Sequence, residues 1–160
     1  MIQRIQSVFL LLVVAGMAAF LFLPFWGKMD PASGNFVMFN PFMLKQVTPT
    51  GGEPVTVYFP YMFCGIGAIA AIIIGVIEIF KYRSRLTQIK FGLVNSIIMS
   101  LVLFSSAWLA LKAQQHYLPE IKGSFKLGLF APVFSMIFNS LANRFIKRDE
   151  DKVRAADRLR

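Results

Sequence analysis

Four long apolar runs, almost free of charge, constrain this chain more than any other feature of its sequence. They cover residues 7–26, 61–80, 91–111 and 127–146, and each holds roughly 20 residues. At a rise of about 1.5 Å per residue, a helix of that length crosses a hydrocarbon core of about 30 Å. Because only helices and closed barrels satisfy their backbone groups in lipid, runs this continuous predict four transmembrane helices.

The first run does not have the pattern of a cleaved signal peptide. Arg4 is the only side-chain cation before it, and the apolar stretch is longer than the usual 7–15 residues. Aromatic residues and Pro24 follow "AGMAA" where a clean cleavage site would be expected. The sequence therefore predicts an uncleaved first helix.

The charged residues predict how the chain is oriented. With the N-terminus in the cytoplasm, five cations face outward: Lys28, Lys45, Lys112, Lys122 and Lys126. Twelve face inward: Arg4, Lys81, Arg83, Arg85, Lys90, Arg144, Lys147, Arg148, Lys152, Arg154, Arg158 and Arg160. Cytoplasmic segments are enriched in Lys and Arg, so this count favours both termini in the cytoplasm.

The same clustering excludes several classes of function. The net charge of +9 comes from cations that flank apolar runs, which argues against a nucleic-acid partner. Cys64 and His116 are the only residues of their types, so we predict no internal disulfide, no metal site and no cofactor. No catalytic set, phosphate loop or HExxH motif is present, and we expect a protein that is not an enzyme.

The outer loop, residues 27–60, contains two β-prone segments, "NFVMFNPF" and "EPVTVYFPY", separated by "TPTGG". Val55, Val57 and Phe59 alternate with more polar residues, which is typical of a half-buried strand. We predict a small hairpin or a pair of short extended segments. Its aromatic residues either cap the bundle at the interface or present a strand edge to a partner.

Small residues recur at every fourth position on two of the predicted helices. Gly67, Ala71 and Gly75 form one row, and Gly92, Ser96 and Ser100 form another. Rows of this kind allow close approach of a neighbouring helix. Glu78 falls about 20° from Gly67 at 100° per residue, so its carboxylate is predicted to face a helix and not lipid.

Polar residues at a shared depth predict a cluster at the inner end of the bundle, with Pro132 kinking the fourth helix above it. Its members are Glu78, Asn95, Asn139, Asn143 and Arg144. Glu78 is expected to accept hydrogen bonds from the asparagines and to pair with Arg144. Three interpretations remain open: interhelical hydrogen bonds that stabilise the bundle, snorkelling of Glu78 toward Lys81, and a proton or ion relay.

The tail, residues 147–160, is predicted to continue the fourth helix into the cytoplasm. Glu150 precedes Arg154 by four residues and Asp157 precedes Arg160 by three, and both spacings stabilise a helix. Such a tail is either a solvated charged helix or a surface that docks on a partner or on anionic lipid.

The chain opens with "MIQRIQSVFLLLV" and closes with "LANRFIKRDEDKVRAADRLR". With four apolar spans between them, these ends resemble the Bacteroidota inner-membrane family known only as a domain of unknown function (DUF 4293). The resemblance covers essentially the whole chain. Its most specific part is the ending, where the matching residues are Asn143, Arg144, Ile146, Asp149, Glu150, Val153, Asp157, Arg158 and Arg160. It implies a four-helix membrane protein with cytoplasmic termini, implies no activity, and favours an interaction role for the tail.

Together these features predict an all-α membrane protein of one transmembrane domain, residues 1–160. We expect a four-helix bundle with a small extracytoplasmic β-hairpin and a helical cytoplasmic tail. The function expected is that of an accessory or scaffolding subunit of a larger inner-membrane assembly, with membrane lipid and a protein partner or second copy as its contacts. The alternative is a small transporter, channel or lipid-binding protein that uses the polar cluster.

Overall fold

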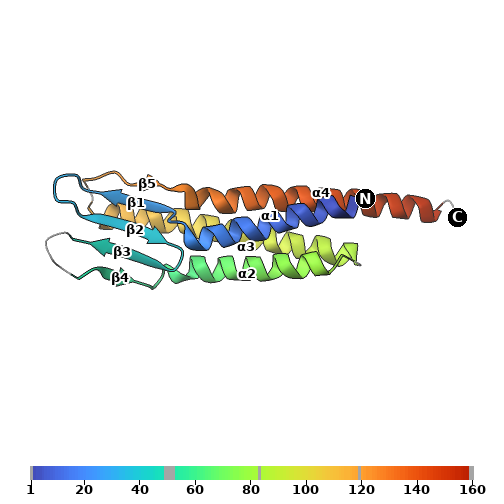
Figure 1. The fold of residues 1–160 in the computed structure, drawn as a ribbon, viewed down its shortest axis with the longest axis horizontal. Helices are drawn as coiled ribbons and strands as arrows, with labels where there is room; N and C mark the ends of the chain where they lie inside the picture. Colours follow the sequence, from blue (N-terminus) through green and yellow to red (C-terminus); the bar gives the residue numbers. More distant parts are fainter. Residues whose placement is uncertain (1, 49–52, 83, 119, 159–160) are drawn as a thin grey trace.

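The computed structural model describes residues 2–48, 53–82, 84–118 and 120–158. Within this part of the chain the long helices are α1 (Ile2–Phe22), α2 (Met62–Phe80), α3 (Arg85–His116) and α4 (Phe130–Arg158). They form one bundle in which α1 and α3 each pack against both α2 and α4. Figure 1 shows that α1 begins, and α4 ends, at the same end of this bundle.

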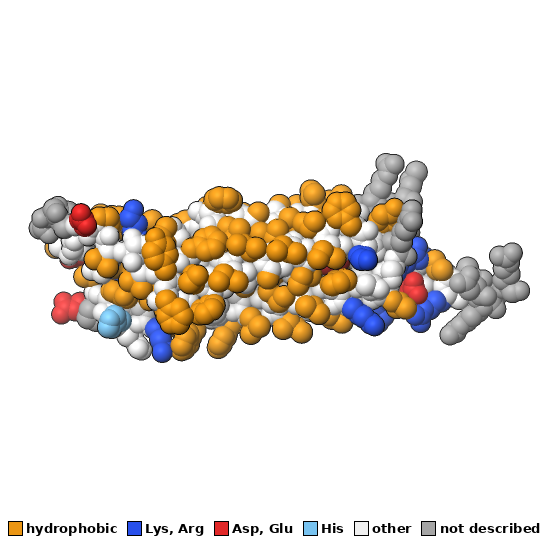
Figure 2. Space-filling view, turned by 90° about the horizontal axis from the view of Figure 1, so that it is seen from below, with side chains coloured by type: hydrophobic (Ala, Val, Ile, Leu, Met, Phe, Trp, Pro, Cys, Tyr) orange, Lys and Arg blue, Asp and Glu red, His pale blue; other side chains and the backbone are white. Residues whose placement is uncertain are grey.

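The surface of the bundle is apolar along most of its length. All four described helices are long and apolar enough to cross a membrane. Large side chains such as Leu101, Phe104 and Ile97 are 63%, 72% and 62% exposed on the outside of α3. Figure 2 shows apolar side chains over the middle of the molecule and most charged ones toward its ends. This distribution is the one expected of a multi-pass membrane protein.

The helix bounds and the place of one proline differ from the sequence prediction. The first helix ends at Phe22 and not at residue 26, because Pro24 follows and the residue before a proline disfavours helical geometry. The third is 32 residues long, since its polar ends are also helical. Pro132 lies in the first turn of α4, where a proline is tolerated, and not in the helix interior, which is the position that the predicted kink requires.

The outer segments form a larger sheet than the predicted hairpin. In the described residues the strands are β1 (Trp26–Met29), β2 (Phe36–Asn40), β3 (Met43–Val47), β4 (Val55–Val57) and β5 (Ser124–Phe125). They are antiparallel in the order β4-β3-β2-β1-β5. The predicted segment "NFVMFNPF" is not one strand: it supplies β2 and the turn into β3, and β3 is the strand that pairs with β4. The turn-rich residues 49–52 lie outside the described residues.

An aromatic stack joins the sheet to the bundle. Phe25 lies between Phe20 at the end of α1 and Phe39 on β2, with ring centroids 5.9 Å and 5.6 Å away. Phe39 also contacts Tyr61, directly before α2, at 4.7 Å. The three phenylalanines are 0% exposed, so this core fixes the sheet on the outer end of the bundle.

Candidate functional site

The site begins with the buried face of α2. Its buried residues are Cys64, Gly65, Ala68, Ala71, Gly75 and Glu78. Most of these have small side chains, which let the neighbouring helices approach closely. Gly67 lies beside this face, where an added Cβ would be 2.6 Å from Val102 Cγ2 of α3. Glu78 is the one titratable carboxyl on the face, and it is 0% exposed.

Two side chains of α3 bracket Glu78. An added Cβ on Gly75, one turn away from Glu78, would lie 3.6 Å from Asn95 Nδ2. On the inner side, Gln88 Nε2 donates a hydrogen bond of 3.1 Å to the main-chain oxygen of Glu78. Asn95 and Gln88 are 0% and 3% exposed. The carboxyl therefore lies in the interior beside a buried amide layer.

Two asparagines of α4 extend this layer. Asn139 Nδ2 donates to the Gly92 main-chain oxygen at 2.7 Å and to Ser96 Oγ at 2.8 Å. The side chain of Asn143 occupies the space beside Gly92, where no Cβ would fit. Gly92 and Ser96 therefore mark the contact between α3 and α4. Ser100 of the same row is exposed, and its hydroxyl donates to the main-chain oxygen of Ser96.

Several polar atoms of this layer have no hydrogen-bond partner among the described residues. They are Glu78 Oε1 and Oε2, Asn95 Oδ1 and Nδ2, Asn139 Oδ1 and Asn143 Oδ1. A buried polar group without a partner is expensive, and such groups concentrate where a structure has a function. Five of these six atoms are oxygens, a composition suited to accepting hydrogen bonds from water or to binding a small cation. We call Glu78, Asn95, Asn139 and Asn143 the polar core.

The structure corrects three predictions about Glu78. Its carboxylate accepts no hydrogen bond from the asparagines within the described residues. It does not snorkel toward Lys81, because it is fully buried and the described part of the chain contains no such pair. Arg144 is not part of the polar core: it is exposed and lines a surface groove on α4. Consecutive helical residues point about 100° apart, so Arg144 turns outward where Asn143 turns inward.

The comparisons with known proteins bear on the whole chain. A sequence model of a family described as "Domain of unknown function (DUF4293)" matches residues 2–159. The chain belongs to this family. No curated protein matches the chain. The family's description names no activity, so any function has to be argued from the residues themselves.

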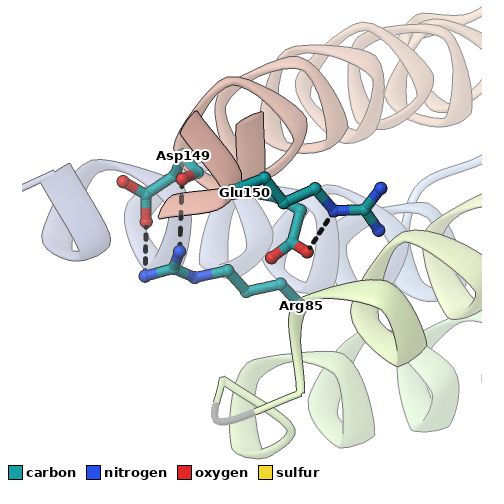
Figure 3. A network of polar contacts seen from close by, with 4 residues as sticks. Arg85, Asp149 and Glu150 are labelled. Atoms are coloured by element: carbon teal, nitrogen blue, oxygen red, sulfur yellow. Dashed lines mark hydrogen bonds and ion pairs between the residues drawn. The ribbon is translucent and has the colours of Figure 1, made fainter. Parts of the chain in front are cut away.

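The family match includes the tail, where α4 extends past the beginning of α3. Arg85 of α3 forms an ion pair with Asp149, with Nη2 and Oδ2 3.0 Å apart, and donates to its main-chain oxygen at 3.2 Å. Figure 3 shows this arginine reaching from α3 to α4. Glu150 pairs with Arg154 at 3.0 Å, as their spacing predicted. Val153 is exposed, and the side chains of Asp157, Arg158 and Arg160 lie outside the described residues.

Sequence reasoning missed a buried cation at the outer end. Lys28 of β1 is 5% exposed, and its Nζ donates to the main-chain oxygens of Gln114, Leu118 and Ile121 at 3.3, 2.8 and 3.4 Å. These carbonyls surround the C-terminus of α3, where the helix dipole favours a positive charge. Burial lowers the pKa of Lys28. In the sequence Lys28 is simply one of the loop cations. Neither it nor Trp26 on the same strand belongs to a pattern that predicts this contact.

No metal centre is indicated by the described residues. Among them, no group of three or more His, Cys, Asp or Glu side chains gathers closely enough to hold a metal ion. The polar core holds most of the buried polar atoms without a partner among the described residues.

Proposed function

We propose that this protein is a multi-pass protein of a bacterial inner membrane, of the kind implied by the resemblance to a Bacteroidota family, and that it is an accessory or scaffolding subunit and not an enzyme. Both termini are cytoplasmic in this proposal. The charge distribution supports the orientation, because the start of α1, the start of α3 and the end of α4 share one end of the bundle and carry most of the cations.

The observation that carries the scaffolding role is the open edge of the outer sheet. β4 is hydrogen-bonded to β3 on one side and ends the described sheet on the other. Val55, at its start, is 57% exposed, and Tyr58 and Phe59 directly after it are 59% and 69% exposed. An edge strand flanked by exposed aromatic residues fits the addition of a strand from another chain.

The interior of the bundle supports the same choice. Outward of the polar core, the helices contribute Val13, Met17, Ala68, Met99 and Val102, each 3% exposed or less. A conducting pore needs a path lined by polar groups or water, interrupted at most by a short hydrophobic constriction that gates it. The packed apolar layer therefore favours a structural role over conduction.

A site-specific photo-crosslinker tests the scaffolding role. The crosslinker would replace Val55 on the strand edge, and Ile97 on the apolar surface of α3 serves as an equally exposed control. We expect position 55 to give a stoichiometric crosslinked species, with a second copy or with another protein, that survives mild extraction. Position 97 should give none. A clean monomer without a crosslink at position 55 would overturn the proposal.

One observation favours a second candidate function. Glu78 is a buried carboxyl whose two oxygens have no partner in the described residues, and intramembrane ionisable groups are characteristic of proton and ion pathways. We propose as the alternative a small transporter that exchanges a proton or monovalent cation at the polar core. In liposomes, Glu78→Gln should abolish a flux that the wild type and the exposed-site control Glu53→Gln retain. A wild-type flux equal to that of empty liposomes rejects this candidate.

A further inference from the structure

The outside of α4 carries a surface groove that neither proposed function uses. It has a volume of about 420 Å³ and lies between Leu103 of α3 and the stripe of α4 from Val133 to Leu141. The single hydroxyl on this stripe, Ser140, donates to the main-chain oxygen of Met136 at 2.9 Å and so is already satisfied. The groove is therefore suited to an apolar chain.

At its inner end the groove becomes basic. Arg144 and Leu141 close the apolar groove and also line an adjoining hollow of about 520 Å³. The other charged residues of that hollow are Lys147, Arg148 and Asp151. The apolar groove therefore continues directly into a hollow that is lined by three cations and one acid.

These cations are not neutralised by neighbouring acids. Among the described side chains the ion pairs are Arg85 with Asp149 and Arg154 with Glu150. Asp149 and Glu150 are therefore engaged with other cations, and Asp151 is the one acid among the residues that line the hollow. We call Arg144, Lys147 and Arg148 the basic triad.

We propose that this groove binds one anionic phospholipid, with its phosphate at the basic triad and an acyl chain along α4 from Leu141 to Val133. Charge complementarity selects this occupant, because a guanidinium binds a phosphate through two parallel hydrogen bonds and the triad exceeds the single acid by two charges. Basic pockets at the cytoplasmic ends of transmembrane helices are suited to anionic headgroups.

The dimensions agree with a lipid of the inner leaflet. Val133 and Arg144 are eleven residues apart, about 17 Å along the helix, which is close to half of a hydrocarbon core of about 30 Å. Arg144 lies five residues before Asp149, so it is about 8 Å deeper than the ion pair at the start of α3. This depth corresponds to the headgroup region, where a long arginine side chain reaches a phosphate.

Native mass spectrometry of the full chain tests the site. The protein would be released from nanodiscs that contain equal amounts of phosphatidylglycerol and phosphatidylcholine. We expect one retained phosphatidylglycerol per chain in the wild type. Arg144→Gln should weaken retention about tenfold, as expected for the loss of one charge-assisted pair of hydrogen bonds. Lys90→Gln is the control: it removes an exposed cation of α3 that lies outside the groove but toward the same end of the bundle as Arg144. It should change retention less than twofold.

A second pair of variants distinguishes the contribution of the apolar groove to lipid binding from that of the basic triad. Ile137→Trp fills the apolar groove without altering any charge, whereas Ile97→Trp adds the same bulk to exposed α3 surface elsewhere. We expect the first to lose the retained lipid and the second to keep it. Equal retention of both lipids by the wild type, equal losses in Arg144→Gln and Lys90→Gln, or full retention in Ile137→Trp would each overturn the proposal. Because Arg144 is exposed and has no ion pair among the described residues, its variant is expected to fold.

Discussion

Replacing Glu78 by methionine tests whether the buried carboxyl stabilises the bundle or serves another purpose. Methionine matches glutamate in length and carries no group that needs a hydrogen bond, and volume-conserving changes in cores cost less than about 1.5 kcal/mol. Both carboxyl oxygens of Glu78 lack a partner in the described residues, and the side chain is 0% exposed. The substitution therefore removes an unsatisfied polar group and little packing.

Two interpretations of the carboxyl predict opposite signs. A buried polar group without a partner costs about 1–3 kcal/mol, so its removal should raise the free energy of unfolding by about 1–2 kcal/mol after repacking. Were the carboxyl instead a stabilising bond between helices, its loss would lower that free energy by about 0.6 kcal/mol and at most about 1.7. We expect stabilisation, seen as a rise of roughly 2–8 °C in Tm for a chain of this size.

Thermal unfolding in a mild detergent measures this difference, with Glu53→Met as the matched control. Glu53 is exposed in the outer loop, so its replacement should change stability by less than about 0.5 kcal/mol. A Glu78→Met variant that loses 1 kcal/mol or more beside an unchanged control would refute the reasoning. That outcome would mean that the carboxyl is bonded in the folded protein, and Glu78→Gln would then show whether an uncharged amide can replace it.

Four further substitutions probe the remaining contacts through the same unfolding assay. Asn139→Ala removes two hydrogen bonds between α3 and α4 and should cost about 1–3 kcal/mol, so a neutral result would contradict their role. Lys28→Met should cost about 1–3 kcal/mol because it removes three hydrogen bonds to main-chain oxygens, although the Leu118 and Ile121 oxygens each keep a second donor. Because burial lowers the pKa of Lys28 below 10.5, the unfolded chain binds more protons between the two values, and wild-type stability relative to this variant should rise with pH there. Gly128→Ala places its Cβ 2.6 Å from the main-chain oxygen of Pro24 and should cost about 1–3 kcal/mol. Gly75→Ala should cost less, because its close contact at 2.9 Å is with a side-chain methyl of Val14 and not with the main chain.

Periodicity within single helices made part of the site predictable. The spacing of Gly67, Ala71 and Gly75 placed Glu78 on a face toward other helices, and the structure buries that residue on the inner face of α2. The same rule, applied to adjacent residues, would have separated Arg144 from Asn143, because a rotation of 100° carries neighbours to different faces. Contacts of Asn139 and Asn143 with Gly92 agree with the predicted shared depth, but depth alone does not say which way a side chain points.

Contacts between distant segments were beyond the reach of sequence patterns. β1 begins at Trp26, four residues after α1 ends, and it pairs with β5 almost a hundred residues later. Neither strand has the length or alternation that signals a strand, so only tertiary pairing identifies them. The burial of Lys28 depends on the same arrangement, because the carbonyls that it contacts belong to the last turn of α3 and to the residues that follow this helix.

The two ends of the molecule are far enough apart for their proposed roles to be tested independently. Glu78 lies sixteen residues beyond Met62, about 24 Å along α2, and β4 lies beyond the outer end of that helix. Changes separated by more than about 10 Å, with no shared partner, normally add in their effects on stability. A double variant that joins Glu78→Met with a charge on the β4 edge at Val55 should therefore change the free energy of unfolding by the sum of the single effects, within about 0.5 kcal/mol. A larger deviation would mean that the packed apolar layer between the ends transmits changes, so that the strand edge and the polar core do not act independently.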